Sequence, residues 1–178
     1  MNSDGKFVAI GSNGNNHNTG NVKVYQYRTV NGNLTWNKMG DFDGEANHDY
    51  FGRSVSLNSA GDIVAIGAYA NGGNGVQSGH VRVYYMTGIQ NNYVFGQGSI
   101  ISGIWEQRGS DIDGESAGDQ SGISVSLNSA GDILAIGAHR NSDNGSQSGH
   151  VRIYQYVGGS WNKFTTDIDG EPDETVVG

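Results

Sequence analysis

The sequence predicts an all-β protein built from three copies of one four-stranded antiparallel unit. Three observations predict it: apolar residues alternate with a period of two, the same segments recur three times, and glycine and asparagine separate the apolar runs. The 178 residues include 30 Gly and a single Pro, and no window has the i, i+3, i+4, i+7 spacing of an amphipathic helix. We therefore expect strands and turns throughout.

The longest recurring segment reads SVSLNSAGDIVAIGA. It covers 54–68, returns at 124–138 as SVSLNSAGDILAIGA, and opens the chain in trimmed form at 1–11. In the two full copies, a pair of apolar runs flanks an Asn-Ser-Ala-Gly turn, in which glycine can supply a positive φ. This block predicts two strands joined by a hairpin.

Two further blocks complete each unit. One is an alternating strand after a glycine, and it reads GNVKVY at 20–25, GHVRVY at 79–84 and GHVRIY at 149–154. The other places a tryptophan shortly before an acidic turn. Counted as a fourth strand, the tryptophan segment gives each unit the strand content of a β-propeller blade.

Equivalent positions divide the chain into repeats at approximately 1–51, 52–121 and 122–178, within a single propeller unit that is cut inside a blade. A blade is apolar on both sides, and closed propellers have about four to eight blades. We expect two chains to associate head to tail as a homodimer that closes a six-bladed ring. Further repeats in a longer parent chain, another ring and an open stack are the alternatives.

Composition excludes several classes of partner. The 10 basic and 18 acidic residues give a net charge of −8, which argues against a nucleic-acid partner. The absence of Cys excludes disulfides, thiolate metal sites and a cysteine nucleophile. No apolar run is long enough to predict a membrane span, and the first residues are polar rather than typical of a secretory leader.

The pair Phe51-Gly52, together with Ser54-Val55, Ile66-Gly67-Ala68 and the GHVRVY segment, resembles the FG-GAP repeat of integrin α-subunit β-propellers and related bacterial surface proteins. The resemblance spans essentially the whole chain, although the Phe-Gly pair is intact only in the second unit. The phrases SGHVRVY and DIDGE are also similar to those of uncharacterised repeat proteins from aquatic microbes. The resemblance implies an extracellular or cell-surface location and no defined activity.

The resemblance also implies a calcium loop between the first two strands of a repeat. Here that place is taken by the short Asn58-Ser59-Ala60-Gly61-Asp62 turn. The family's calcium site is therefore not carried over to these positions.

A different acidic pattern, Asp-x-Asp-Gly-Glu, closes each repeat. Oxygen ligands at alternating positions before a glycine suit Ca²⁺, whereas Asp and Gly are also ordinary turn residues, and both interpretations stay open. The candidate calcium ligands, and with them the only cofactor considered, are Asp41, Asp43, Glu45, Asp111, Asp113, Glu115, Asp167, Asp169 and Glu171.

The aromatic residues have two interpretations as well. Trp36, Trp105 and Trp161 are candidate sugar-stacking platforms, but their recurrence in register favours packing of the outer strands. His80 and His150 occupy equivalent positions at the head of a strand, where we expect a structural role. The equivalent cations Arg82 and Arg152 are expected to pair with acids or carbonyls between blades.

Most of the candidate polar residues recur at equivalent positions of the repeats. Such recurrence indicates a structural role rather than a cluster of catalytic residues. We therefore predict a noncatalytic recognition or scaffold module that binds a glycan or a protein through repeated loops. The alternatives are a hydrolase or lyase with a site in the central channel, and a purely structural assembly unit.

Overall fold

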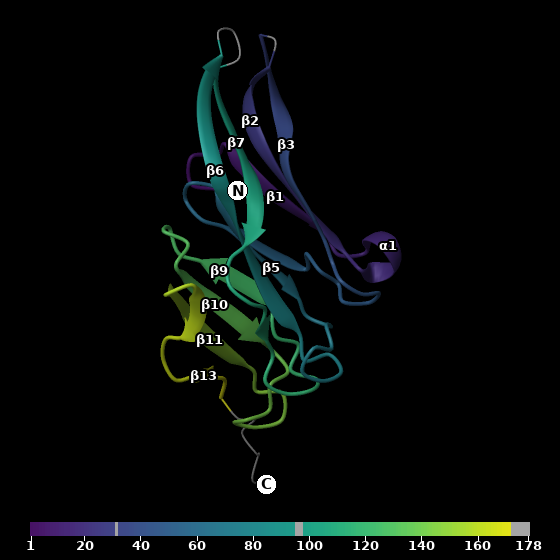
Figure 1. The fold of residues 1–178 in the computed structure, drawn as a ribbon. Coiled ribbons are helices and arrows are strands. Elements are labelled where there is room, and N and C mark those ends of the chain that lie inside the picture. The colour runs from purple at the N-terminus through teal and green to yellow at the C-terminus, as the bar shows by residue number, and fades with distance from the viewer. Residues whose placement is uncertain (31, 95–97, 172–178) are drawn as a thin grey trace.

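The computed structural model describes residues 1–30, 32–94 and 98–171, with the side chains of 89 and 91–102 left out. These residues form three antiparallel sheets that stack one against the next (Figure 1). The only helical element among them is the single turn α1 (Asn15–Asn18), in which Asn16 and His17 have left-handed backbone angles. The prediction of an all-β fold is confirmed, and no described helix has the length and apolar character needed to span a membrane.

Each sheet takes its strands from one stretch of the chain. The first sheet contains β1 (Phe7–Ser12), β2 (Asn21–Val30) and β3 (Asn33–Asp43). The second contains β4 (Ser54–Leu57), β5 (Ile63–Ala68), β6 (His80–Val94), β7 (Gly98–Gln107) and β8 (Ile112–Asp113). The third contains β9 (Ser124–Leu127), β10 (Ile133–Ala138), β11 (His150–Val157), β12 (Ser160–Lys163) and β13 (Ile168–Asp169).

The second and third sheets have the predicted four-strand order, and β8 and β13 add a feature that the sequence does not predict. Both short strands lie in the acidic turns, where they pair with the starts of β6 and β11. In the first sheet the same segment simply continues β3, which ends at Asp43. The acidic segments therefore run along the sheet before they turn away from it.

Alternation along the strands gives each sheet two apolar faces. We call the face that carries the tryptophan the leading face. In the second sheet it consists of Val64, Ile66, Tyr84 and Trp105. The opposite, trailing face of the first sheet consists of Phe7, Ala9, Val22, Val24 and Phe42. These two faces pack together and form one core cluster.

The same contact is repeated at the next junction. The leading face of the third sheet contains Leu134, Ile136, Tyr154 and Trp161, and it packs on the trailing face of the second. Because side chains on both sides of the second sheet are buried, β5 is buried along its whole length. The core therefore lies between sheets, as expected for blades.

Glycines bring neighbouring sheets into backbone contact. A Cβ on Gly67 would overlap the carbonyl oxygen of Gly122, and Gly11 meets Gly52 in the same way. Single parallel bridges join Gly20 to Phe51 and Gly79 to Ser121. The segment that enters each new sheet thus lies directly on the sheet before it.

The turn between β4 and β5 is organised by one asparagine. The Asn58 Oδ1 accepts hydrogen bonds from the backbone N–H groups of Gly61, Asp62 and Ile63 at 3.0 to 3.1 Å, and its Nδ2 donates to Asp62. Asn128 makes the same set of bonds between β9 and β10. The two asparagines differ in burial: Asn58 is 4% exposed, whereas Asn128 lies in an exposed turn.

Replacing Asn58 with Ala leaves the N–H groups of Asp62 and Ile63 without their acceptor, whereas Gly61 N–H keeps the carbonyl of residue 58 at 3.2 Å. Because the site is buried, we expect Asn58→Ala to lower the free energy of unfolding by about 2 kcal/mol. In the unassociated chain, where Asn128 is exposed, the matched Asn128→Ala exposes the same donors to water and should cost less than half as much. Urea unfolding of both variants measures the difference, and equal losses would contradict the assigned role of burial.

Candidate functional site

Polar clusters lie at the junctions between sheets, and each is built from the same repeat positions. The first residue of the strand after the long loop is Asn21, His80 or His150. Across the sheet it pairs in register with the second aspartate of the acidic turn, as His80 does with Asp113 and His150 with Asp169. Strand pairing therefore places one histidine or asparagine against the carboxylates of its own repeat.

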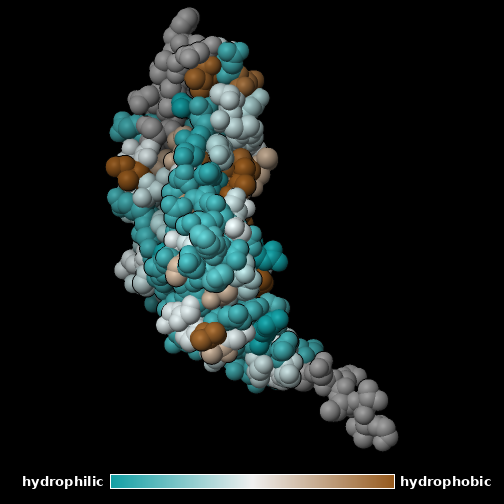
Figure 2. Space-filling view, turned by 90° about the vertical axis from the view of Figure 1, so that its right-hand side faces the viewer, coloured by the Kyte–Doolittle hydropathy of each residue, from teal (hydrophilic) through white to brown (hydrophobic). Residues whose placement is uncertain are grey.

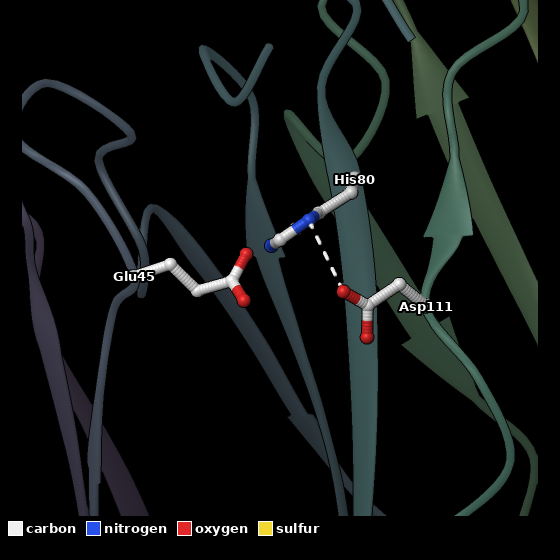
Figure 3. A group of neighbouring side chains, drawn as sticks. All are labelled: Glu45, His80 and Asp111. Atoms are coloured by element: carbon white, nitrogen blue, oxygen red, sulfur yellow. Dashed lines mark ion pairs between the residues drawn. The ribbon is translucent and has the colours of Figure 1, made fainter. Parts of the chain in front are cut away.

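The cluster between the first and second sheets contains Glu45, His80 and Asp111 (Figure 3). Glu45 reaches across from the first sheet, and the His80 ring on β6 lies between the two carboxylates. A ring nitrogen of His80 is 3.8 Å from Asp111. Arg82 connects the group, because its guanidinium donates to both oxygens of Asp111 at 2.8 and 2.9 Å and also pairs with Glu45.

These contacts shift the ionisation of the cluster. Burial lowers the pKa of His80, and the nearby Arg82 charge lowers it further, so the ring is held neutral. Burial alone would raise the pKa of Asp111, but the hydrogen bonds and charge of Arg82 outweigh it and leave that pKa below its usual value. Arg82 itself stays charged, because its two carboxylate partners outweigh the cost of its burial. The cluster is a closed ion-pair network that joins two sheets.

In the first repeat, asparagine stands where the other repeats have histidine, and its side-chain amide donates hydrogen bonds to the carboxylates of the acidic turn. The Asn21 Nδ2 donates to Asp41 at 2.7 Å and to Asp43 at 2.9 Å. Lys38 adds a 2.7 Å contact to the other oxygen of Asp41. The Asn21 bond and the Lys38 ammonium lower the pKa of Asp41. Two of the candidate calcium ligands thus already have donors.

The cluster between the second and third sheets contains Glu115, His150 and Asp167. Lys163 pairs with Asp167 at 2.7 Å, which raises the pKa of the lysine, and it lies 3.7 Å from Glu115. Arg152 differs from its equivalent in the second repeat. It donates to the carbonyl of Asp113 at 3.0 Å and reaches Glu115 only at 3.4 Å.

The remaining acids serve in part as turn residues. Asp49 and Asp119 are buried; each accepts a backbone N–H of its own turn and the side-chain amide of Asn71 or Asn141. Asp169 and Glu171 are exposed at the end of the described residues. Calcium binding by the acidic turns stays a prediction.

The loop between the first two strands of a repeat does not fit the calcium ion that the FG-GAP resemblance implies. Its one carboxylate, Asp62, already accepts a hydrogen bond from Asn58. The same asparagine satisfies the backbone donors of the turn. A side chain therefore closes this loop where the family uses an ion.

The three tryptophans occupy equivalent positions in unequal surroundings. Trp105 packs edge-on against Phe42 and donates its indole N–H to the carbonyl of Met39 at 3.0 Å. Trp161 likewise donates to the carbonyl of Arg108 at 2.7 Å. Trp36, on the outer face of the first sheet, is 42% exposed and lines an apolar hollow. Packing between sheets thus accounts for Trp105 and Trp161.

A polar hollow opens where the loops of the second and third sheets meet. It measures about 470 Å³ and lies between the turn around Asp119 and the loop after β10. Arg140, Ser142, Asp143 and Gln147 line its loop side. These groups offer hydrogen-bond donors and acceptors without a large apolar surface.

The fold and the repeated junctions define a repeat protein of β-propeller type. Residues 38–84 and 111–154, together just over half of the chain, match the model of the FG-GAP repeat. The chain belongs to this repeat family. Each match runs from the end of one sheet into the β6 or β11 strand of the next, so it includes the segment that links two sheets. No curated protein matches the sequence.

The buried histidine predicts a pH dependence of stability. The folded chain holds His80 neutral, whereas the unfolded chain protonates it below about pH 6.5, so stability should fall as pH drops from that value toward the lowered folded pKa. His80→Asn, which installs the residue of the first repeat, removes this proton uptake. Urea unfolding between pH 8 and 5 should therefore give a flatter profile for the variant, and parallel profiles would contradict the assignment.

Proposed function

We propose that this chain is a noncatalytic recognition and scaffold module that binds a glycan through loops repeated from sheet to sheet. The loops after β5 and β10 share their internal bonds: Gly79 N–H donates to Asn71 and Gly149 N–H to Asn141, both at 2.9 Å. Equivalent loops held in equivalent geometry are the observation that carries the proposal. They favour several weak contacts acting together.

The surface around these loops supports a polar ligand. Figure 2 looks onto the α1 side of Figure 1, and this face is largely hydrophilic, with apolar side chains in small separate groups. The hollow beside Arg140 and Gln147 has the amide, hydroxyl and charged groups that hydrogen-bond sugar hydroxyls. A glycan fits this surface better than an extended apolar peptide.

A glycan array incubated with the labelled chain tests this function. We expect retention on a subset of oligosaccharides, with a fall of about tenfold or more in affinity for the double variant Arg140→Ala, Gln147→Ala, because each side chain contributes polar contacts. Ser160→Ala, on an exposed strand start away from the hollow, is the matched control. Mass spectrometry of the bound sugars should show no cleavage. Loss of sugar mass would favour the enzyme instead, and no retention would contradict glycan binding.

We further propose that two copies close a six-bladed ring. The leading face of the first sheet is uncovered, with Ile10 50% exposed beside Trp36. The trailing face of the third sheet is also uncovered, with Val151 36% and Ile168 56% exposed. These faces are the counterparts of the two that pack together at each observed junction, so a second copy supplies the matching surface at both ends.

Charge supports the same pairing. At the two observed junctions, a glutamate after the acidic turn meets a cation of the next sheet, as Glu45 meets Arg82 and Glu115 meets Arg152. The equivalent residues at the uncovered faces are Glu171 and Lys23. Ring closure would place Glu171 of one copy beside Lys23 of its partner, and Trp36 would find a carbonyl equivalent to that of Arg108.

A charge exchange tests the ring. The unchanged chain should have a solution mass of twice 18.9 kDa by light scattering. Lys23→Glu and Glu171→Lys should each weaken association about tenfold or more, because like charges then face each other at both seams. The double variant restores opposite charges and should dimerise again, whereas Arg53→Glu, an exposed position at the entry to the second sheet, should not matter. A folded monomer before any substitution would contradict the proposal.

A further inference from the structure

The strongest unexplained group in the described residues is His150. It is 4% exposed, and neither of its ring nitrogens has a hydrogen-bond partner. A neutral imidazole has one donor N–H and one acceptor nitrogen, and both need partners when the ring is buried. This arrangement is therefore costly in the absence of a ligand. Asp167, in the same cluster, is paired only with the Lys163 ammonium, which lies 2.7 Å from one of its oxygens.

We propose that Glu115, His150 and Asp167 form a binding site for a divalent transition-metal ion of the zinc class. One ligand atom from each of the three side chains lies within 4.8 Å of the other two. Zinc bonds of about 2.0 to 2.2 Å place tetrahedral ligands about 3.3 Å apart, so the groups must close by about 1.5 Å at most. Glu115 has the freedom to do so, because its side chain is 37% exposed.

The second repeat shows why the site is specific to the third. Around His80 the equivalent carboxylates are occupied, since Arg82 donates to both oxygens of Asp111 and pairs with Glu45. In the third repeat the equivalent Arg152 is diverted: it donates to the carbonyl of Asp113 and to the hydroxyl of Ser121. Arg152 also lies 3.4 Å from Glu115, but it forms no ion pair with Asp167, so it does not bridge the two carboxylates around His150 as Arg82 does around His80.

Lys163 is the main competitor for the ion. Its ammonium is 2.7 Å from Asp167, and the lysine side chain is 42% exposed whereas that of Asp167 is 17% exposed. Because the lysine side chain is in contact with water, its ammonium can move into solvent when a metal bound by three ligands takes its place. The second repeat has Gln107 in this position, in the same register opposite the tyrosine.

The ligand set also selects the metal. Calcium prefers six to eight oxygen atoms, whereas zinc combines imidazole nitrogen with carboxylate oxygen at low coordination number. The acidic turns alone would suit calcium, but the histidine changes the preference. The site does not require the ring, because Glu115, His150 and Asp167 all belong to one chain, and none of the three lines the polar hollow.

Zinc titration of the EDTA-treated full chain tests the site by calorimetry, with Co²⁺ absorption as a report on coordination. We expect one Zn²⁺ per chain, little response to Ca²⁺, and at least about tenfold weaker binding for His150→Asn. The matched His80→Asn should bind as the unchanged chain does. Lys163→Gln should bind more tightly, because it removes the competing charge and installs the residue of the second repeat.

Glu115→Gln keeps the test decisive if His150→Asn fails to fold, since Glu115 is partly exposed and its replacement retains the shape. Its binding should also weaken, while its circular dichroism stays that of the unchanged chain. Three results would overturn the proposal: no Zn²⁺ binding, equal losses for His80→Asn and His150→Asn, or binding that survives both His150→Asn and Glu115→Gln.

Discussion

The structure depends on the close approach of one sheet's backbone to the next. Gly20 and Gly79 each form a bridge to the segment that enters the following sheet, and Gly67 lies so near Gly122 that no side chain fits between them. Because these contacts fix both the distance and the register between sheets, the apolar faces meet in the same way at both junctions. The FG-GAP family match covers the segment that leads from one sheet into the next in both cases, so the repeat of the family includes this link as well as strands of the sheet.

Once the backbones are fixed, small substitutions change the electrostatics without changing the fold. The same strand position carries Asn21, His80 or His150, and each meets carboxylates from the acidic turn. The Asn21 amide donates hydrogen bonds to these carboxylates. The carboxylates around His80 are instead ion-paired with Arg82. Around His150, Lys163 pairs with Asp167 and Arg152 with Glu115, but the His150 ring itself has no hydrogen-bond partner. Near-identical repeats thus hold chemically different sites.

Local pattern was enough to predict the strands, the hairpin turns and the two apolar faces, because these follow from a period of two and from the turn chemistry of residues such as Asn58 and Gly61. It also favoured packing for Trp105 and Trp161, which the inter-sheet hydrogen bonds support. It treated His80 and the acids as separate features, although strand register brings them together. The diversion of Arg152 and the short strands β8 and β13 depend on contacts between distant segments, which periodicity does not encode.

The hairpin of β6 and β7 is longer than its counterparts and extends beside β2 and β3 at one end of the molecule (Figure 1). It interrupts the internal symmetry of three similar units. A macromolecule that touches this arm can dock in a single orientation, whereas the stacked loops alone would allow it to shift by one repeat. For the binding proposed here, contact with this arm would restrict the complex to one alignment along the repeats.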